Sequence, residues 1–280
     1  MVFDYADKIG CGSSRRRKGP TSVSVVEIYN PPTKIFFDII LFIVYFWINV
    51  LVWFETKGTF MQNQKIADNI YNFYHKAEQP NHRYKSWEWC YVYFHNNKES
   101  LRAARGNLPD LALLHLGFYL ASWGMFRGST VLLQKDFKIY ADLLDELLDE
   151  KYDILWCWND DDISSKNRDI FIMTLLKAVS VVKNILEKIS NGRPCSDTLA
   201  TKILLGIYGC VPAYDDFVKK TLRQLNIQKT VNEKSLNALF DFYYENRELF
   251  SKKLPLTNYP DVMYPIMKKI DMALFVIEKS

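Results

Sequence analysis

Apolar residues recur at the spacing of an α-helix along most of this chain. Besides the clearest stripes, helices are predicted over 168–190, 198–209, 214–226, 233–249 and 262–278. No two alternating segments are joined by a tight turn, so no β-hairpin is expected. The pattern predicts an all-α protein. The three clearest stripes are Ile66, Ile70, Phe73 and Tyr74; Leu111, Leu114, His115, Phe118 and Tyr119; and Leu143, Leu144, Leu147 and Leu148.

Clusters of Gly, Pro, Asn and Ser interrupt these stripes and predict where the helices end. They lie at 79–81, 107–109, 159–165, 191–194 and 254–255. The interruption near 159–166 predicts a boundary between compact units. We therefore expect a two-lobed multi-helix globular domain, with a first helical lobe over 61–160 and a second over 161–280.

A hydrophobic N-terminal segment precedes this domain. Over residues 35–54 the only charged side chain is Asp38, and the segment is long enough to cross a bilayer. Aromatic residues at both ends suit the membrane interface, so the segment predicts a single-pass transmembrane helix, with a buried core helix as the alternative. A cleavable signal peptide fits less well, because the apolar run is too long and no small-residue cleavage site follows it.

Residues 1–60 also have an interpretation as a leader that is not translated. The basic residues 15–18 would hold the amino terminus in the cytoplasm and export residues 61–280, which places unpaired cysteines in an oxidising compartment. The codons for Lys57 and Gly58 can spell a purine-rich ribosome-binding sequence of bacterial type before Met61. If translation starts at Met61, residues 61–280 are cytoplasmic. If the full chain is made, it is a single-pass membrane protein, and only then is a membrane its partner.

Composition narrows the classes of function. Lys and Arg number 36 against 32 for Asp and Glu, so the net charge does not support a large nucleic-acid-binding surface, although DNA stays open as a partner. Five cysteines and four histidines show no pattern of zinc ligands, and the acidic run at 160–162 lacks the spacing of a calcium loop. We expect no metal and no cofactor, and the sequence leaves the ligand or protein partner unidentified.

The segment Asn81 to Phe94 is dense in aromatic and polar side chains. Arg83, Trp87 and Glu88 are candidates for a pocket that stacks a planar ligand and pairs its charges. The alternative is a buried stripe of Trp87, Cys90, Tyr91 and Phe94, with Arg83 and Glu88 at the surface. Spacing alone does not separate these two interpretations.

The segment Ala121 to Asp136 holds a second group of candidates. Gly124 and Gly128 lie four residues apart, either on one helical face or with Gly128 at a helix end. Small residues allow a close backbone approach, and Arg127 beside them is suited to hold an anion. The alternative is tight helix packing with a structurally paired arginine. The ligand-binding candidates here are Trp123, Arg127, Ser129 and Gln134.

In residues 190–225 a Gly- and Pro-containing turn leads into an apolar helix, and after Val211-Pro212 the pair Asp215-Asp216 opens another helix. This order of elements resembles the later part of the helix-hairpin-helix DNA glycosylase superfamily. The resemblance implies that Asp215, with Asp216 as second choice, is the catalytic aspartate that stabilises charge on the sugar or activates a nucleophile. Lys202 lies in the helix where bifunctional members keep a lysine, although its separation from Asp215 differs. The family's L-P-G-V-G hairpin is also replaced, by the turn at 191–194.

These observations lead to three hypotheses of function. The first is an α-helical binding or interaction protein with a distantly glycosylase-like second lobe. The second is a base- or nucleotide-processing enzyme that uses Asp215, and the third is a membrane-tethered interaction domain. An enzyme needs Asp215 in a cleft with aromatic or basic neighbours, whereas Asp215 as a simple helix cap needs only a helix start at the surface.

Overall fold

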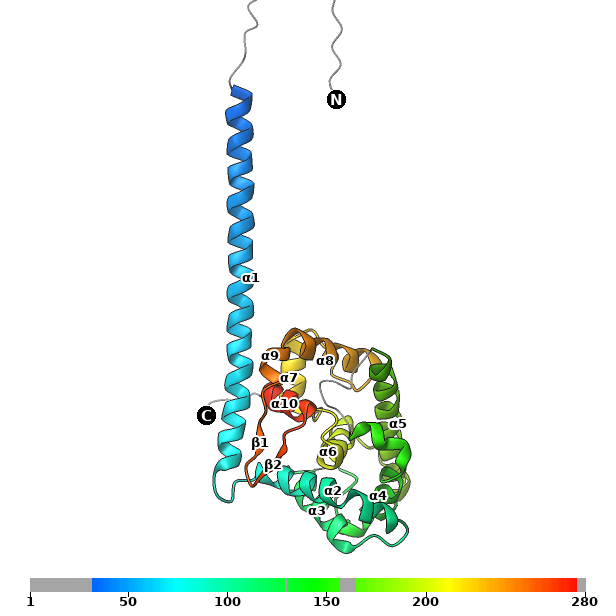
Figure 1. Ribbon diagram of the computed structural model, residues 1–280. Coiled ribbons are helices and arrows are strands. Elements are labelled where there is room, and N and C mark those ends of the chain that lie inside the picture. Colours follow the sequence, from blue (N-terminus) through cyan, green and yellow to red (C-terminus); the bar gives the residue numbers. More distant parts are fainter. Residues whose placement is uncertain (1–31, 129, 157–164, 276–280) are drawn as a thin grey trace, which may run out of the picture. The chain divides into compact units, whose positions relative to one another are not determined.

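The computed structural model of the chain describes residues 32–128, 130–156 and 165–275, with side chains described at 40–49, 64–128, 130–156 and 167–275. These residues are mostly helical, with one short two-stranded hairpin, which confirms the predicted all-α class (Figure 1). The elements are α1 (Pro32–Glu78), α2 (Lys85–Ala103), α3 (Asp110–Ser122), η1 (Phe137–Tyr140), α4 (Ala141–Leu147), η2 (Glu150–Leu155), α5 (Ser165–Ile189), α6 (Asp197–Tyr208), α7 (Asp216–Gln224), α8 (Glu233–Glu245), α9 (Arg247–Phe250), β1 (Pro255–Leu256), β2 (Tyr259–Met263) and α10 (Ile266–Leu274).

The chain divides into two compact units, residues 1–55 and residues 56–280, and α1 contributes to both. In the first unit every described side chain, from 40 to 49, is exposed. Among the described residues, no helix combines the length and the apolar character of a membrane span. The rest of the predicted span, residues 35–39 and 50–54, has side chains outside the described ones, and residues 1–31 of the predicted leader lie outside the description altogether.

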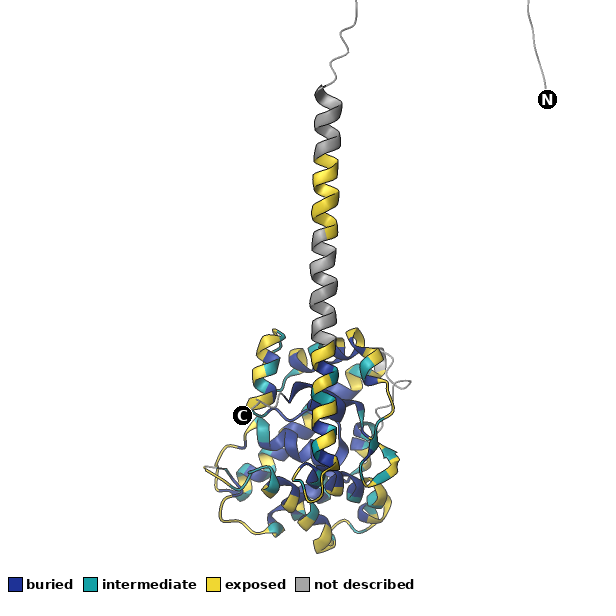
Figure 2. Cartoon of the chain, turned by 90° about the vertical axis from the view of Figure 1, so that its left-hand side faces the viewer, coloured by how far each residue is buried: buried dark blue, intermediate teal, exposed yellow. Residues whose placement is uncertain are grey.

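The core of the second unit surrounds α6. Every residue from Leu199 to Tyr214 is buried, and α6 packs against α2, α3 and α5 (Figures 1 and 2). Because α2 and α3 precede residue 160 and α6 follows it, helices from both predicted lobes pack together. The predicted boundary itself falls largely on residues 157–164, which lie outside the described residues.

Two of the three predicted apolar stripes lie as expected, and one does not. Ile66 and Phe73 are buried, as is the whole leucine stripe of α4 and its end. On α3 the helix is present, but Leu111, Leu114 and Phe118 of the stripe are exposed, and only Tyr119 is fully buried. The helix packs through its opposite face, and since both faces are apolar, periodicity does not identify the buried one. The buried residues of α3 are Ala112, Leu113, Leu116, Gly117, Tyr119 and Leu120.

The hairpin of β1 and β2 corrects the expectation that the chain has no strand pair. Leu256 pairs with Tyr259, and the helix predicted over 262–278 begins only at Ile266. A tertiary contact holds this hairpin: the Glu88 carboxylate, fully buried on α2, accepts hydrogen bonds from the backbone N–H and the hydroxyl of Thr257. This contact comes from 169 residues away in sequence, so the local pattern contains no sign of it.

Candidate functional site

A cavity of about 210 Å³ lies between α6, the start of α7 and the segment that follows α3. Its walls combine aromatic rings with basic side chains and one pair of neighbouring carboxylates. Such a mixture suits a planar ligand that also carries negative charge. The lining residues are Arg83, Trp123, Met125, Arg127, Thr198, Lys202, Asp215, Asp216, Phe217 and Phe275.

An ion pair between Lys202 and Asp215 lies in this cavity. Lys202 is almost fully buried on α6, and its Nζ lies 3.0 Å from Oδ2 of Asp215. The other carboxylate oxygen, Oδ1, accepts a hydrogen bond from the backbone N–H of Val218 at 3.1 Å and so caps α7. The prediction that Asp215 opens a helix is therefore confirmed, and one carboxylate serves as both a cap and the partner of a buried charge.

Trp123 forms the aromatic wall beside this pair. The Lys202 ammonium lies 4.8 Å from the centroid of the indole ring, and the Arg83 guanidinium lies 5.1 Å from it. Tyr84 stacks on the indole at 5.2 Å, and Phe275 meets it edge-on at 5.8 Å. The indole N–H is buried and has no hydrogen-bond acceptor among the described residues. Two cations on one ring are favourable because the π face is negative.

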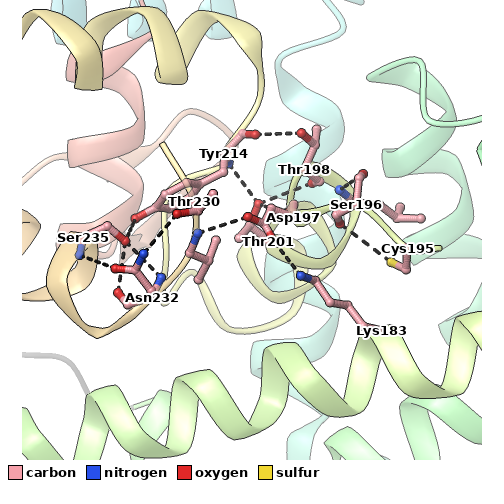
Figure 3. Close-up of polar contacts among 12 residues, drawn as sticks. Lys183, Cys195, Ser196, Asp197, Thr198, Thr201, Tyr214, Thr230, Asn232 and Ser235 are labelled. Carbon is pink, nitrogen blue, oxygen red and sulfur yellow. Dashed lines mark hydrogen bonds and ion pairs between the residues drawn. The ribbon is translucent and has the colours of Figure 1, made fainter. Parts of the chain in front are cut away.

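A network of hydroxyl groups fixes the residue before Asp215 (Figure 3). The hydroxyl of Thr201 accepts a hydrogen bond from the backbone N–H of Tyr214 at 2.9 Å, and the hydroxyl of Thr198 donates to the Tyr214 carbonyl at 2.7 Å. The Tyr214 phenol donates a hydrogen bond to the hydroxyl of Ser235 at 3.1 Å. With its N–H, its carbonyl and its side chain all held, Tyr214 gives Asp215 a fixed position at the cavity.

The start of α6 belongs to the same network. Ser196 caps the helix by accepting the N–H of Leu199, and one oxygen of Asp197 pairs with Lys183 at 2.5 Å. The other Asp197 oxygen accepts the N–H of Val231 at 3.1 Å, which ties α6 to the segment before α8 (Figure 3). These contacts place Thr198 and Lys202 at fixed points on one helix.

A second buried ion pair lies behind the cavity on α10. The Asp271 carboxylate accepts the N–H of Ala213 at 2.8 Å and pairs with Lys268 at 2.6 Å. Burial lowers the pKa of Lys268, the charge of Asp271 raises it again, and Lys202 lowers it further. The electrostatic contribution of Lys202 links the two buried pairs.

The structure brings together six of the residues singled out in the sequence, because all of these line the cavity: Arg83, Trp123, Arg127, Lys202, Asp215 and Asp216. Gly124 and Gly128 lie beyond the end of α3 with positive φ angles, so they share no helical face. The atoms nearest to a Cβ placed on Gly124 belong to the flexible Arg127 side chain, with Nη2 at 2.3 Å, so this contact is not the close backbone approach that was predicted.

Trp87 and Glu88 are buried in the core and do not line this cavity. The Trp87 indole donates to the Leu205 carbonyl at 2.8 Å and stacks on Tyr91 and Tyr264, as in the predicted buried stripe. Of the two charged residues which that alternative placed at the surface, Arg83 is exposed and Glu88 is not.

Two further predicted ligand-binding residues are not among the described residues that line the cavity, and some residues that line it were not predicted. Gln134 is exposed in the turn before η1, away from the cavity, and Ser129 lies outside the described residues. Thr198, Phe217 and Phe275 line the cavity without having been predicted. Lys202, which the glycosylase resemblance had singled out, is also the one charged residue in the sequence from 198 to 214. No family model, curated protein or solved structure gives a significant match to this chain.

Proposed function

We propose that this chain is a base- or nucleotide-processing enzyme that cleaves the bond between a nucleobase and its sugar, with Asp215 and Lys202 as its reacting groups. One observation carries the proposal: Lys202 Nζ lies 3.0 Å from Asp215 Oδ2 inside a cavity lined by aromatic and basic side chains. This arrangement supports an enzyme, since Asp215, which also caps α7, lies in a cleft with aromatic and basic neighbours. The glycosylase resemblance of residues 190–225 supports the same assignment.

In the proposed reaction the base stacks against Trp123 or Phe217, and the arginines hold negative charge of the ligand. Lys202 first passes a proton to Asp215, which leaves a neutral amine. The amine attacks C1′ of the sugar while the bond from C1′ to the base breaks and its electron pair leaves with the base. The base takes the proton from Asp215, and the carboxylate so restored stabilises the positive charge that the new bond leaves on the Lys202 nitrogen.

The direct test uses the full chain and an oligonucleotide with one abasic site, in the presence of sodium borohydride. Attack by Lys202 on the open sugar aldehyde forms an imine, which borohydride reduces to a stable adduct of added mass. We expect the adduct in the parent protein and in Lys219→Gln, whose ammonium lies 3.3 Å from Thr198 at the edge of the site. If Lys202→Gln forms no adduct, the proposal is supported. If Lys202→Gln forms as much adduct as the parent protein, the proposal is contradicted.

Base release then tests Asp215. Oligonucleotides that carry deaminated, oxidised or alkylated bases are incubated with the parent protein and with Asp215→Asn, which keeps a capping side chain. We expect release of one base class by the parent protein and at least a hundredfold slower release by the variant, the order of loss for an acid–base group. If ligands bind but no base is released, the chain is a binding protein instead.

Membrane tethering is a second candidate property, and residues 40–49 support it. Nine consecutive side chains, Ile40 to Ile48, are large, apolar and exposed around the whole helix. A helix that is apolar on every face is stable when protein or lipid surrounds it. Alkaline extraction of cell membranes tests this property: a chain that stays in the membrane pellet is tethered, and one that is released is not.

A further inference from the structure

The outer face of α3 carries apolar side chains that the core does not use. Phe118 is 65% exposed, and Leu111 and Leu114 lie on the same face at helical spacing. Large exposed apolar side chains gathered on one face are typical of a binding surface, whereas scattered ones are not. This face therefore suggests a partner.

Phe118 borders a groove of about 610 Å³, a volume within the usual range of ligand sites. Across the groove lies Trp89 on α2, whose ring is 40% exposed. Tyr259 meets this ring edge-on at 5.6 Å and so fixes its orientation. The groove thus presents two aromatic rings, and Tyr259 contacts one of them, Trp89, edge-on.

The groove also carries positive charge. Arg83, Lys85 and His82 line it, and none of the described residues that line it is acidic. Partial burial, and after it the charges of Lys76 and Arg83, lower the pKa of His82, so its imidazole is neutral near pH 7 and the positive charge of the groove comes from Arg83 and Lys85. A partner that fits here carries negative charge as well as planar apolar groups.

Arg83 lines both this groove and the cavity that contains Lys202 and Asp215, so one side chain borders both spaces. Its guanidinium lies over the Trp123 ring, at the wall that the two spaces share. A chain-like ligand that contacts Arg83 from the groove therefore touches a residue of the cavity wall.

We infer that this groove binds a single-stranded polynucleotide, whose bases stack on Trp89 and Phe118 and whose phosphates pair with Arg83 and Lys85. Stacking on exposed rings beside basic side chains is how single strands are bound without a requirement for sequence. A base-paired duplex keeps its base faces stacked on one another and offers none to these rings. The inference rests on the proposed function and deepens it, because the strand in the groove would deliver one nucleotide to the cavity.

The test measures the dissociation constant of the full chain for a fluorescent twelve-residue oligothymidylate by fluorescence anisotropy. The comparison ligands are the matching duplex and a strand of the same length whose backbone carries no bases. We expect the single strand to bind at least tenfold more tightly than either one. Equal binding of the base-free strand would reduce the contact to charge alone and would overturn the inference.

Substitutions of groove residues test whether the single strand binds in the groove. Phe118→Ala should weaken binding of the single strand roughly tenfold, in the range measured for loss of one stacking ring. Lys85→Gln should lower the slope of log K against log salt by about 0.7, as expected for one lost phosphate contact on a single strand. The matched controls are Met173→Ala and Lys177→Gln on the exposed face of α5, which should leave both quantities unchanged.

The outcomes separate this inference from the proposed function. Binding that depends on Phe118, without base release or a borohydride adduct, supports the groove and contradicts the proposed chemistry. An adduct that depends on Lys202, with binding indifferent to Phe118 and Lys85, supports the chemistry and overturns the groove. Because Phe118 is exposed, Phe118→Ala should not change the thermal unfolding midpoint. Trp89→Phe is a second variant, and it keeps an aromatic ring at the other side of the groove.

Discussion

Lys202 and Asp215 are thirteen residues apart in sequence and 3.0 Å apart between Nζ and Oδ2. The lysine belongs to α6, and the aspartate is the residue before α7, so the connection between the two helices brings the pair together. The same carboxylate caps α7 through Oδ1. Its two oxygens therefore have separate roles, and substitutions separate them.

The first prediction compares Asp215→Asn with the loss of an ordinary helix cap. Asn also caps well, so a cap alone would be kept at little cost. The variant, however, leaves the buried Lys202 ammonium without its partner, and breaking a buried pair from one side costs about 3 kcal/mol. We expect a loss of that size in the unfolding free energy from urea titration. Ser196→Ala, which removes only the cap of α6, should cost about 1 kcal/mol.

A double-mutant cycle identifies the source of that loss. The combination Lys202→Met with Asp215→Asn removes both charges, so it should lose less stability than the sum of the two single variants. A loss below about 0.5 kcal/mol in Asp215→Asn alone would mean that the cap is the whole role of Asp215.

The second prediction concerns the crossing of α6 and α3. A Cβ on Gly206 would lie 2.7 Å from the ring of Tyr119, which is fully packed in the core. Gly206→Ala should therefore destabilise the protein by about 1–3 kcal/mol, the usual cost of overpacking. On α3 a Cβ at Gly117 would lie 3.3 Å from Tyr140, a contact that a small shift relieves. Equal thermal midpoints for Gly206→Ala and Gly117→Ala would contradict the difference.

Most helices were predictable because their stripes and caps are local signals. Asn232 before α8 and Asp215 before α7 both accept N–H groups of the first turn, as such residues do at helix starts. The side chosen for burial on α3 was not predictable, since Leu114 and Leu113 are equally apolar and only the packing partner distinguishes them. The hairpin was hidden for a similar reason, because the distant Glu88 stabilises it.

The cavity was predictable residue by residue but not as a set. Arg83, Trp123 and Asp215 stood out by side-chain type in three separate segments, and nothing local indicated that these segments meet. Trp87 was singled out for the same chemistry as Trp123, although it donates to a backbone carbonyl in the core. Burial, which a single sequence does not show, decides between two such tryptophans.

The third prediction concerns residues 61–280. The second compact unit begins at Thr56, and its described core includes no side chain before Ile66. A chain that starts at Met61 should therefore be soluble and unfold in one cooperative transition, measured by circular dichroism in urea. If it aggregates and recovers only when residues 35–54 are restored in detergent, the N-terminal segment belongs to the fold.

The fourth prediction concerns how stability changes with pH in alkali. Buried lysine and buried tyrosine change it in opposite directions, so the prediction is made for the pH range in which the tyrosines dominate. Burial lowers the pKa of Lys268 below the ordinary value of 10.5, so the unfolded chain binds more protons there and stability rises with pH up to about that value. Burial raises the pKa of Tyr119 and Tyr208 above 10.0, so the folded chain keeps protons that the unfolded chain loses. Above pH 10.5 the tyrosines therefore dominate, and stability falls as the pH rises.

Tyr264 isolates one such contribution. Burial is the larger cause and the negative charge of Glu88 the next, and together they raise the pKa of this phenol well above 10.0. Its contribution to stability is therefore complete below pH 10 and is lost above it, by up to about 1.4 kcal/mol per pH unit. Between pH 10.5 and 11.5 the unfolding free energy of Tyr264→Phe should fall less steeply than that of the parent protein. At pH 8 the variant should be less stable than the parent, because Glu88 loses a hydrogen-bond donor. Phe118→Ala, which removes no titratable group, should keep the parent slope. An unchanged slope in Tyr264→Phe would show that the phenol loses its proton as readily in the folded chain as in the unfolded one.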